Sequence, residues 1–308
     1  MPLPVHPPPP SPLDRHRQLA PSASVRVSPL CLGSMNFSDA WKDSLGECSK
    51  ETAVEILDYF ITQGQNCDQL VLVTHFSSSY KNHESDELQS NYGAKSMRVS
   101  LELSLQKLQT SYIHLFYLHW WDYTVSIPEL MHSLNDLVVS GKVIYLGISD
   151  CPAWVVAKAN QYVRDHGLRQ FSVYQGLWNA SFRGFEREIL PMCRDENMGV
   201  VPGGTLGQGQ FPTEAGYKER EQNNPGRKGR PPRMARKPSP YFFPVVGGRK
   251  VEHLRGTIAA LDLSLSVEEM AQIEAAYPFD HGFPHTFLSG THFDGSSPRT
   301  PDGPGACG

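Results

Sequence analysis

Ser111-Tyr-Ile-His-Leu-Phe-Tyr-Leu-His119-Trp-Trp-Asp122 is a β-rich run that ends abruptly in a histidine and two tryptophans. Apolar residues at helical spacing precede it over residues 96–108, while a helical pattern over 127–139 and a strand pattern over 143–148 follow it. Helices and strands that alternate with turn residues between them predict a parallel α/β fold. Because such folds bind ligands at the carboxyl ends of their strands, His119 is the first candidate for a functional residue.

The composition is that of a globular protein and excludes several classes of function. A length of 308 residues allows one large domain or two small ones, and α/β barrels commonly fill this length as one; 39% of the residues are hydrophobic. The net charge of -4 and the pI near 6.3 argue against a general nucleic-acid binder. The six cysteines form no CxxC pair, which predicts neither a metal site nor a disulfide framework. With no apolar run near the roughly 18 residues of a membrane helix and no secretory signal, we expect a cytoplasmic protein without membrane or nucleic-acid partners.

The chain divides into three regions by composition. Residues 1–24 are proline-rich and lack periodicity, so we expect a disordered arm. Residues 25–288 carry the alternating helix and strand patterns and form the folded domain. Residues 289–308 are rich in Gly, Pro and Ser, which predicts a flexible tail.

Strand patterns of parallel type occur near residues 28, 71, 114, 145, 173, 200 and 243. A (β/α) barrel has eight strands, so this count is one short. Between Gly64 and Leu70 there is no room for a strand and a crossover helix. The stretch between the last two strand patterns is long enough for a helix but has no helical period. Because strand number, shear and tilt are linked in a closed barrel, we expect an open or distorted barrel of lowered stability.

Five ordered motifs, each at the end of an expected strand, resemble the aldo-keto reductase superfamily and most closely its fungal norsolorinic-acid-reductase and aryl-alcohol-dehydrogenase type. They are Val27-Ser-Pro-Leu-Cys-Leu-Gly-Ser-Met-Asn36, Tyr117-Leu-His-Trp-Trp-Asp122, Tyr145-Leu-Gly-Ile-Ser-Asp150, Tyr174-Gln-Gly-Leu-Trp-Asn179 and Phe243-Pro-Val-Val-Gly-Gly-Arg-Lys-Val-Glu-His-Leu254. The resemblance implies a TIM-type (β/α) barrel that is degenerate here. Its second βα unit and the helix after the seventh family strand are missing.

The resemblance also implies a reaction, namely reduction of a carbonyl or oxidation of an alcohol with NADP(H) and without a metal. The family uses a tyrosine as proton donor, supported by an aspartate, a lysine and a histidine. His119 matches the family histidine. The lysine position is His75, which either takes over the role of the lysine or has drifted and has no function. The segment that carries the aspartate and the tyrosine would lie between Gly64 and Asp68 and is absent.

Cofactor-binding residues follow from the same resemblance. Ser149 and Asp150 match the pair that hydrogen-bonds the nicotinamide carboxamide, and Gln175 matches its next partner. Arg249 and Lys250 suit the dianionic 2′-phosphate of the adenosine, since guanidinium and ammonium groups are the usual partners of phosphates. The remaining matches are Gly203, Gly204, Thr205, Leu206 and Gly207 over the pyrophosphate, with Gly247, Gly248 and Leu254 beside the adenosine phosphate.

Two hypotheses follow. The first is an NADP(H)-dependent reductase whose small-molecule carbonyl substrate is an aromatic polyketide or a related fungal secondary metabolite. The second is a catalytically impaired relic, or a cofactor-binding pseudoenzyme, because general acid catalysis contributes about 10²–10⁴-fold and the family tyrosine is missing.

Overall fold

A computed structural model describes residues 9, 11–37, 46–63, 70–77, 93–121, 123–205, 241–275 and 279–285. Five parallel strands form its central sheet in the order β4-β5-β6-β7-β8. They are β4 (Val73–Phe76), β5 (Ile113–Leu118), β6 (Val143–Ser149), β7 (Phe171–Leu177) and β8 (Gly199–Gly203). The β-rich run quoted above is therefore the second strand of this sheet, and His119 directly follows its last residue.

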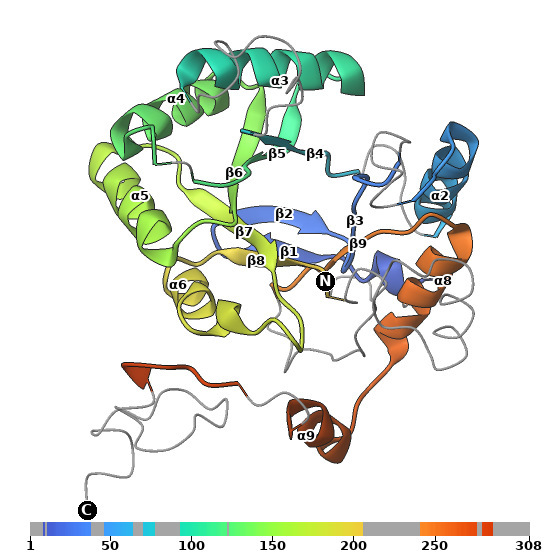
Figure 1. The fold of residues 1–308 in the computed structure, drawn as a ribbon. Coiled ribbons are helices and arrows are strands. Elements are labelled where there is room, and N and C mark those ends of the chain that lie inside the picture. The colour runs from blue at the N-terminus through green and yellow to red at the C-terminus, as the bar shows by residue number, and fades with distance from the viewer. Residues whose placement is uncertain are drawn as a thin grey trace, which may run out of the picture.

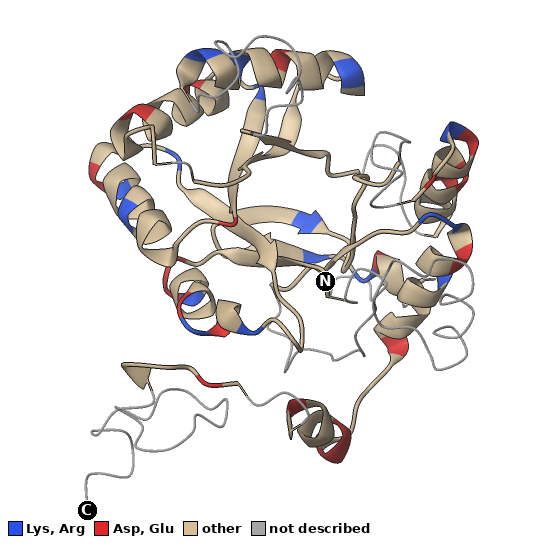
Figure 2. Ribbon diagram, in the orientation of Figure 1, with Lys and Arg blue, Asp and Glu red and all other residues tan. Residues whose placement is uncertain are grey.

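Four helices follow the strands of the sheet around its outer face (Figure 1). They are α3 (Ala94–Leu108), α4 (Ile127–Val139), α5 (Ala153–His166) and α6 (Ile189–Asp195). Their apolar stripes pack against outward-facing strand residues such as Phe116, Leu146 and Ile148 in the largest hydrophobic cluster. Charged residues lie mainly on the outer helices, whereas the strands of the sheet carry few (Figure 2). Burial of apolar side chains between helix and sheet is the main force that holds this part of the molecule together.

The other face of the sheet is covered by an antiparallel hairpin of β1 (Arg17–Ala20) and β2 (Ala23–Val27) (Figure 1). Leu19, Ala20 and Ala23 are buried there against inward-facing strand residues. The prediction of a disordered arm is therefore wrong from residue 11 onward, where a short 3₁₀ helix (Pro12–Asp14) precedes the hairpin. The proline-rich composition predicted disorder, but this segment also contains a few apolar residues whose side chains pack against the inner face of the sheet. Residues 1–8 and the tail 289–308 lie outside the described residues.

The ring continues from β8 through residues 242–246 to two short parallel strands. Val200 forms a bridge with Phe242, after which β9 (Val245–Val246) pairs with β3 (Cys31–Leu32). Helices α2 (Lys50–Thr62) and α8 (Val251–Ala259) cover this side. Over the described residues, β3 does not pair with β4. Over the part of the chain that the structure describes, the ring of strands is open there, where the sequence predicts that a βα unit is missing, so the degenerate barrel is confirmed. The stretch 206–240, where the helix after the seventh family strand is expected to be missing, lies outside the described residues.

Local signals in the sequence explain where most helices begin and end. The side chains of Ser49 and Ser126 cap α2 and α4 by accepting backbone N–H groups, and Gly167 ends α5 in the left-handed conformation. The helical pattern over residues 185–196 does not form one helix: a 3₁₀ turn (Gly184–Glu186) is followed by α6. Pro191 explains this break, because proline fits only the first turn of a helix and so places the start of α6 near Ile189. The last helix is α9 (Val267–Ala275).

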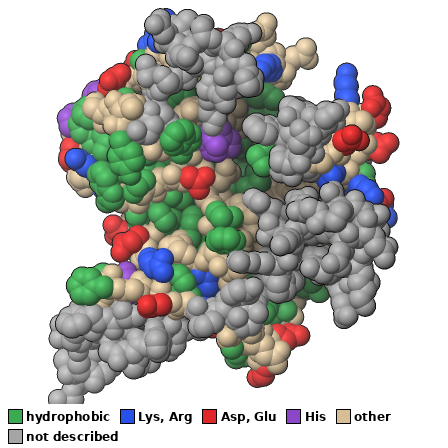
Figure 3. Space-filling model, viewed as in Figure 1, with side chains coloured by type: hydrophobic (Ala, Val, Ile, Leu, Met, Phe, Trp, Pro, Cys, Tyr) green, Lys and Arg blue, Asp and Glu red, His purple; other side chains and the backbone are tan. Residues whose placement is uncertain are grey.

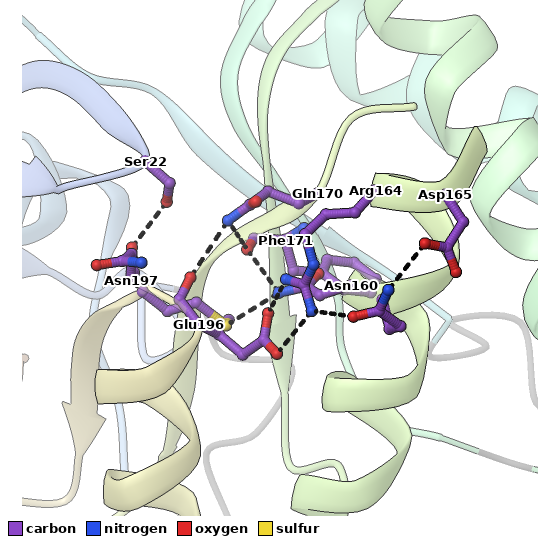
Figure 4. A network of polar contacts seen from close by, with 10 residues as sticks. Ser22, Asn160, Arg164, Asp165, Gln170, Phe171, Glu196 and Asn197 are labelled. Carbon is purple, nitrogen blue, oxygen red and sulfur yellow. Dashed lines mark hydrogen bonds and ion pairs between the residues drawn. The ribbon is translucent and has the colours of Figure 1, made fainter. Parts of the chain in front are cut away.

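A polar network joins elements at the amino-terminal ends of the strands (Figure 4). The guanidinium of Arg164 in α5 donates to both oxygens of Glu196, at 2.6 and 3.2 Å. Buried Asn160 donates to the carbonyl of Phe171 and accepts from its N–H. The Ser22 hydroxyl in the hairpin turn donates to the carbonyl of Asn197 at 2.8 Å. The network therefore ties α5, α6, β7 and the hairpin together at the end of the molecule away from His119.

Candidate active site

Polar side chains from four neighbouring strands meet at one rim of the sheet. In register, His75 pairs with Tyr117, Tyr117 with Gly147, and Ser149 with Gln175. These residues alternate with outward-facing core residues, so their side chains point to the inside of the curled sheet. Seen from this side, histidine atoms lie near the centre of the face, beside hydrophobic and acidic side chains (Figure 3).

His75 connects two strands that are not neighbours. Its Nε2 lies 2.7 Å from Oε1 of Gln175, which comes from β7, so this contact crosses over β5 and β6. The His75 ring is stacked on Tyr117, with centroids 4.7 Å apart and an interplanar angle of 11°. The ring of His119 meets His75 edge-on at 5.4 Å. Only a strongly curved sheet brings residues of β4 and β7 into contact, so the structure brings three predicted site residues together.

The stack beneath His75 depends on a glycine. A Cβ atom at Gly147 would lie 2.4 Å from the Tyr117 ring, closer than any real contact. The ring of Tyr117 thus occupies the space that a side chain at residue 147 would fill. Tyr117 is 1% exposed, and its hydroxyl has no hydrogen-bond partner among the described residues. Burial raises its pKa well above the ordinary value of 10, so the phenol stays protonated.

The environment of His75 favours a neutral ring. By surface area the residue is exposed, although protein atoms surround its ring at the rim. The pKa of His75 is lowered to about 4, chiefly by desolvation; the Gln175 hydrogen bond opposes this shift, and nearby His119 makes a smaller contribution that also lowers the pKa. The expectation that His75 takes over the role of a cationic lysine therefore meets a physical obstacle, since at neutral pH the ring carries no charge.

Ser149 and Asp150 form the next part of the rim. Ser149 is 2% exposed, and its hydroxyl donates to Oδ2 of Asp150 at 3.3 Å. Asp150 has a φ of 43°, in the left-handed region, and its N–H donates to the carbonyl of Gln175 at 3.1 Å. This backbone conformation is uncommon for a residue with a side chain and holds the exposed carboxylate at the end of β6.

The residues expected over a pyrophosphate lie only partly in the described chain. Gly203 ends β8 and accepts a hydrogen bond from the N–H of Trp178. Gly204 has a φ of 66°, and its carbonyl accepts from the side chain of Asn179 at 2.9 Å. Thr205 follows and is partly exposed. Leu206 and Gly207 lie outside the described residues.

The residues expected beside the adenosine phosphate surround the first turn of α8. Gly247 and Gly248 precede it, and Lys250 is its N-cap residue without a side-chain cap. The Arg249 guanidinium packs over Gly46, where no side chain would fit. Leu254 is only 3% exposed and packs in the hydrophobic cluster between α2 and α8, so its side chain is structural.

The sequence did not identify Tyr117 and Gly147 as residues that shape the site, and it did not distinguish Trp120 from Trp121. The structure separates the tryptophans, because Trp121 is 9% exposed and packs in the main core whereas Trp120 is 45% exposed. The alternation of inward and outward residues along β5 identifies Tyr117 as inward-facing, but it does not extend to the tryptophans, which follow the end of the strand. Among the described residues, no cluster of three or more potential metal ligands occurs.

Comparison with known proteins places these features in a family. A model of the aldo/keto reductase family matches residues 65–239. Norsolorinic acid reductase B of Dothistroma septosporum is 55% identical, over 94% of this chain and 88% of that protein. Norsolorinic acid reductase A of Aspergillus parasiticus is 44% identical (93% and 87%), and a putative aryl-alcohol dehydrogenase of Saccharomyces cerevisiae is 38% identical (92% of each).

The first of these alignments runs over 346 residues, more than the 308 residues of this chain. That relative therefore carries segments that have no counterpart here, in line with the open ring of strands. With more than half of the chain matched by the family model and relatives aligned over nearly its whole length, this chain belongs to the aldo/keto reductase family.

Proposed function

We propose that this protein is an NADP(H)-dependent reductase that reduces a carbonyl, or oxidises an alcohol, of an aromatic polyketide or related fungal secondary metabolite. One observation carries the proposal: His119, His75 and Gln175 converge at the carboxyl ends of three strands in a member of an oxidoreductase family. The names of the similar fungal reductases support the substrate class.

The chain offers groups that suit both ends of a nicotinamide dinucleotide. At one end the Gln175 amide, Ser149 and Asp150 supply hydrogen-bonding groups for a carboxamide. At the other end, the first turn of α8 has no side-chain cap, and Arg249 and Lys250 lie beside it. A helix N-terminus with adjacent cations favours a phosphate. Because β7, β8 and β9 follow one another around the ring, both groups lie along one rim.

NADP(H), when bound, supplies or accepts the hydride. We assign His119 to the oxygen of the substrate, where a hydrogen bond from its ring would stabilise the negative charge that develops during reduction. His75 lies against His119 and completes the polar surface. The cation that the family places at residue 75 is replaced by a ring that stays neutral at pH 7.

That replacement favours a second candidate function, a cofactor-binding protein with little or no turnover. A neutral His75 cannot lower the pKa of a neighbouring phenol by its charge, as a lysine does. The Tyr117 phenol is sealed from solvent and keeps its proton, so it is no substitute donor. Residues 64–69, where the segment with the family tyrosine is expected to be absent, lie outside the described residues.

Two measurements separate these functions. NADPH fluorescence titration reports cofactor binding, and turnover of an aromatic aldehyde reports catalysis. The reductase predicts both, with turnover lowered about 10²–10⁴-fold by His119→Ala. The matched control is His132→Ala, which removes an exposed histidine from α4 and should leave turnover unchanged. Binding without turnover would favour the second candidate, and turnover that His119→Ala leaves unchanged would remove His119 from the mechanism.

Other features of the chain bear on where the protein is found in the cell and on what it binds. Among the described residues, no helix is long and apolar enough to cross a membrane. The four cysteines that the structure describes are free thiols, which supports our proposal of a cytoplasmic protein. We propose a small-molecule carbonyl compound as its partner rather than a nucleic acid, in keeping with the net charge of -4.

A further inference from the structure

We infer that His75 is a positioning residue that holds the Gln175 amide in the orientation needed to bind a carboxamide ligand. This inference rests on the proposed function, because it assigns the carboxamide to the nicotinamide of NADP(H). It concerns the contact between His75 and Gln175, which joins strands β4 and β7 across the rim.

The atoms in this contact define its direction. Oε1 of Gln175 is an amide oxygen and can only accept, so Nε2 of His75 donates across the 2.7 Å. In the neutral ring the other nitrogen, Nδ1, then carries a lone pair. With its oxygen engaged by His75, the Gln175 amide keeps its NH₂ group for donation to a ligand. Such a group donates hydrogen bonds to a carbonyl oxygen, which a carboxamide provides.

The packing around His75 fixes its ring in that direction. The ring lies flat on Tyr117, and Tyr117 in turn lies over Gly147. On its edge, His75 is in contact with the ring of His119. Rotation of the ring out of this stack would break the contact with Gln175. The same three neighbours would hold the amide before the cofactor arrives, and preorganisation of this kind favours binding.

A positioning role and a role as proton donor make different predictions. If His75 holds Gln175, its removal weakens cofactor binding by the effect of one hydrogen bond, about 3- to 10-fold. If His75 donates a proton to the substrate, its removal lowers kcat by about 10²–10⁴-fold and leaves the dissociation constant unchanged. The dissociation constant for NADPH, measured by fluorescence titration without substrate, therefore separates the two roles.

The experiment compares His75→Leu, Gln175→Leu and the double variant. We expect each single variant to bind NADPH about 3- to 10-fold more weakly, and the double variant to bind no more weakly than Gln175→Leu alone. His75→Gln is the conservative variant, because its amide nitrogen reaches the place of Nε2, and it should restore binding to near the wild-type value. The control His132→Leu removes an exposed histidine whose Nε2 also makes a hydrogen bond, to Tyr162 at 3.1 Å.

A second readout needs no cofactor. In ¹⁵N-histidine spectra of the cofactor-free protein, His75 should carry its proton on Nε2, and its signal should shift in Gln175→Leu but not in His132→Leu. A proton on Nδ1, or NADPH binding in which the two changes add independently, would overturn the positioning role. Failure of the wild-type protein to bind NADPH would instead refute the proposed function, and it would be seen in the first titration.

Discussion

Gly147 shows how one residue shapes the interior of the rim. Because a Cβ atom there would lie 2.4 Å from the Tyr117 ring, Gly147→Ala should force the ring, and with it His75, out of place. Overpacking of this kind costs about 1–3 kcal/mol of unfolding free energy. The matched control is Gly256→Ala in α8, where no atom lies within 4 Å of the added Cβ. Because alanine favours a helix over glycine, this change should raise the unfolding free energy by about 0.5–1 kcal/mol. Urea unfolding measures both, and equal stability of Gly147→Ala and the wild type would contradict the stacked arrangement.

His75 also makes stability depend on pH. In the unfolded chain a histidine titrates near 6.5, whereas desolvation lowers the pKa of folded His75 to about 4. As the pH falls, the unfolded state therefore takes up the proton first, which stabilises it relative to the folded state. The stability that rests on neutral His75 is complete above pH 6.5 and is lost between about 6.5 and 4.

We therefore expect the wild type to lose more unfolding free energy between pH 7 and pH 5 than His75→Gln, whose side chain does not titrate. Urea unfolding at the two pH values provides the comparison. The solvent contact of His75 reduces the size of the effect but does not change its sign. A loss that is the same in both proteins would show that the ring is not desolvated in the folded state.

Among the elements, α5 and α6 are joined by an ion pair with one buried partner. Glu196 is 5% exposed, and Arg164 donates to both of its oxygens (Figure 4). Arg164→Met would leave the carboxylate without its cation, and because the Arg164 side chain is 44% exposed we expect a loss of about 1–3 kcal/mol. Arg98→Met is the control, since the pair of Arg98 with Asp136 is mostly exposed and should contribute less than about 0.5 kcal/mol. If Arg164→Met and Arg98→Met lowered the unfolding free energy in urea by similar amounts, the buried Glu196 would not depend on its ion pair for stability.

The elements also show which parts of the fold a sequence can predict. Helices α2, α4 and α5 were predictable because their caps and apolar stripes are local signals. The β1–β2 hairpin was not, since its stability comes from contacts with residues of distant strands, such as Leu115, Val173 and Val201, rather than from its own pattern. The contact of His75 with Gln175, 100 residues apart, likewise depends on the curvature of the whole sheet. The sequence could predict that both residues lie at strand ends, but it could not predict that their side chains are in contact.

For the whole molecule, the opening between β3 and β4 is the dominant feature. A closed barrel pairs every strand on both sides, whereas here each of these two strands has one neighbour over the described residues. We therefore expect a thermal transition, followed by circular dichroism, at or below the 45–65 °C of ordinary mesophile domains. A cooperative transition well above that range would show that the ring is closed by other contacts.

We propose that the rim of this open barrel forms one nicotinamide dinucleotide site. Isothermal titration of NADPH into the wild-type protein tests it most directly, with NADH and the variant Arg249→Ala as comparisons. We predict one molecule bound per chain, with NADPH preferred over NADH and the preference lost in Arg249→Ala, because we assign the Arg249 guanidinium to the phosphate that only NADPH carries. Absence of binding, or equal affinity for the two cofactors in the wild type, would show that the rim is not such a site.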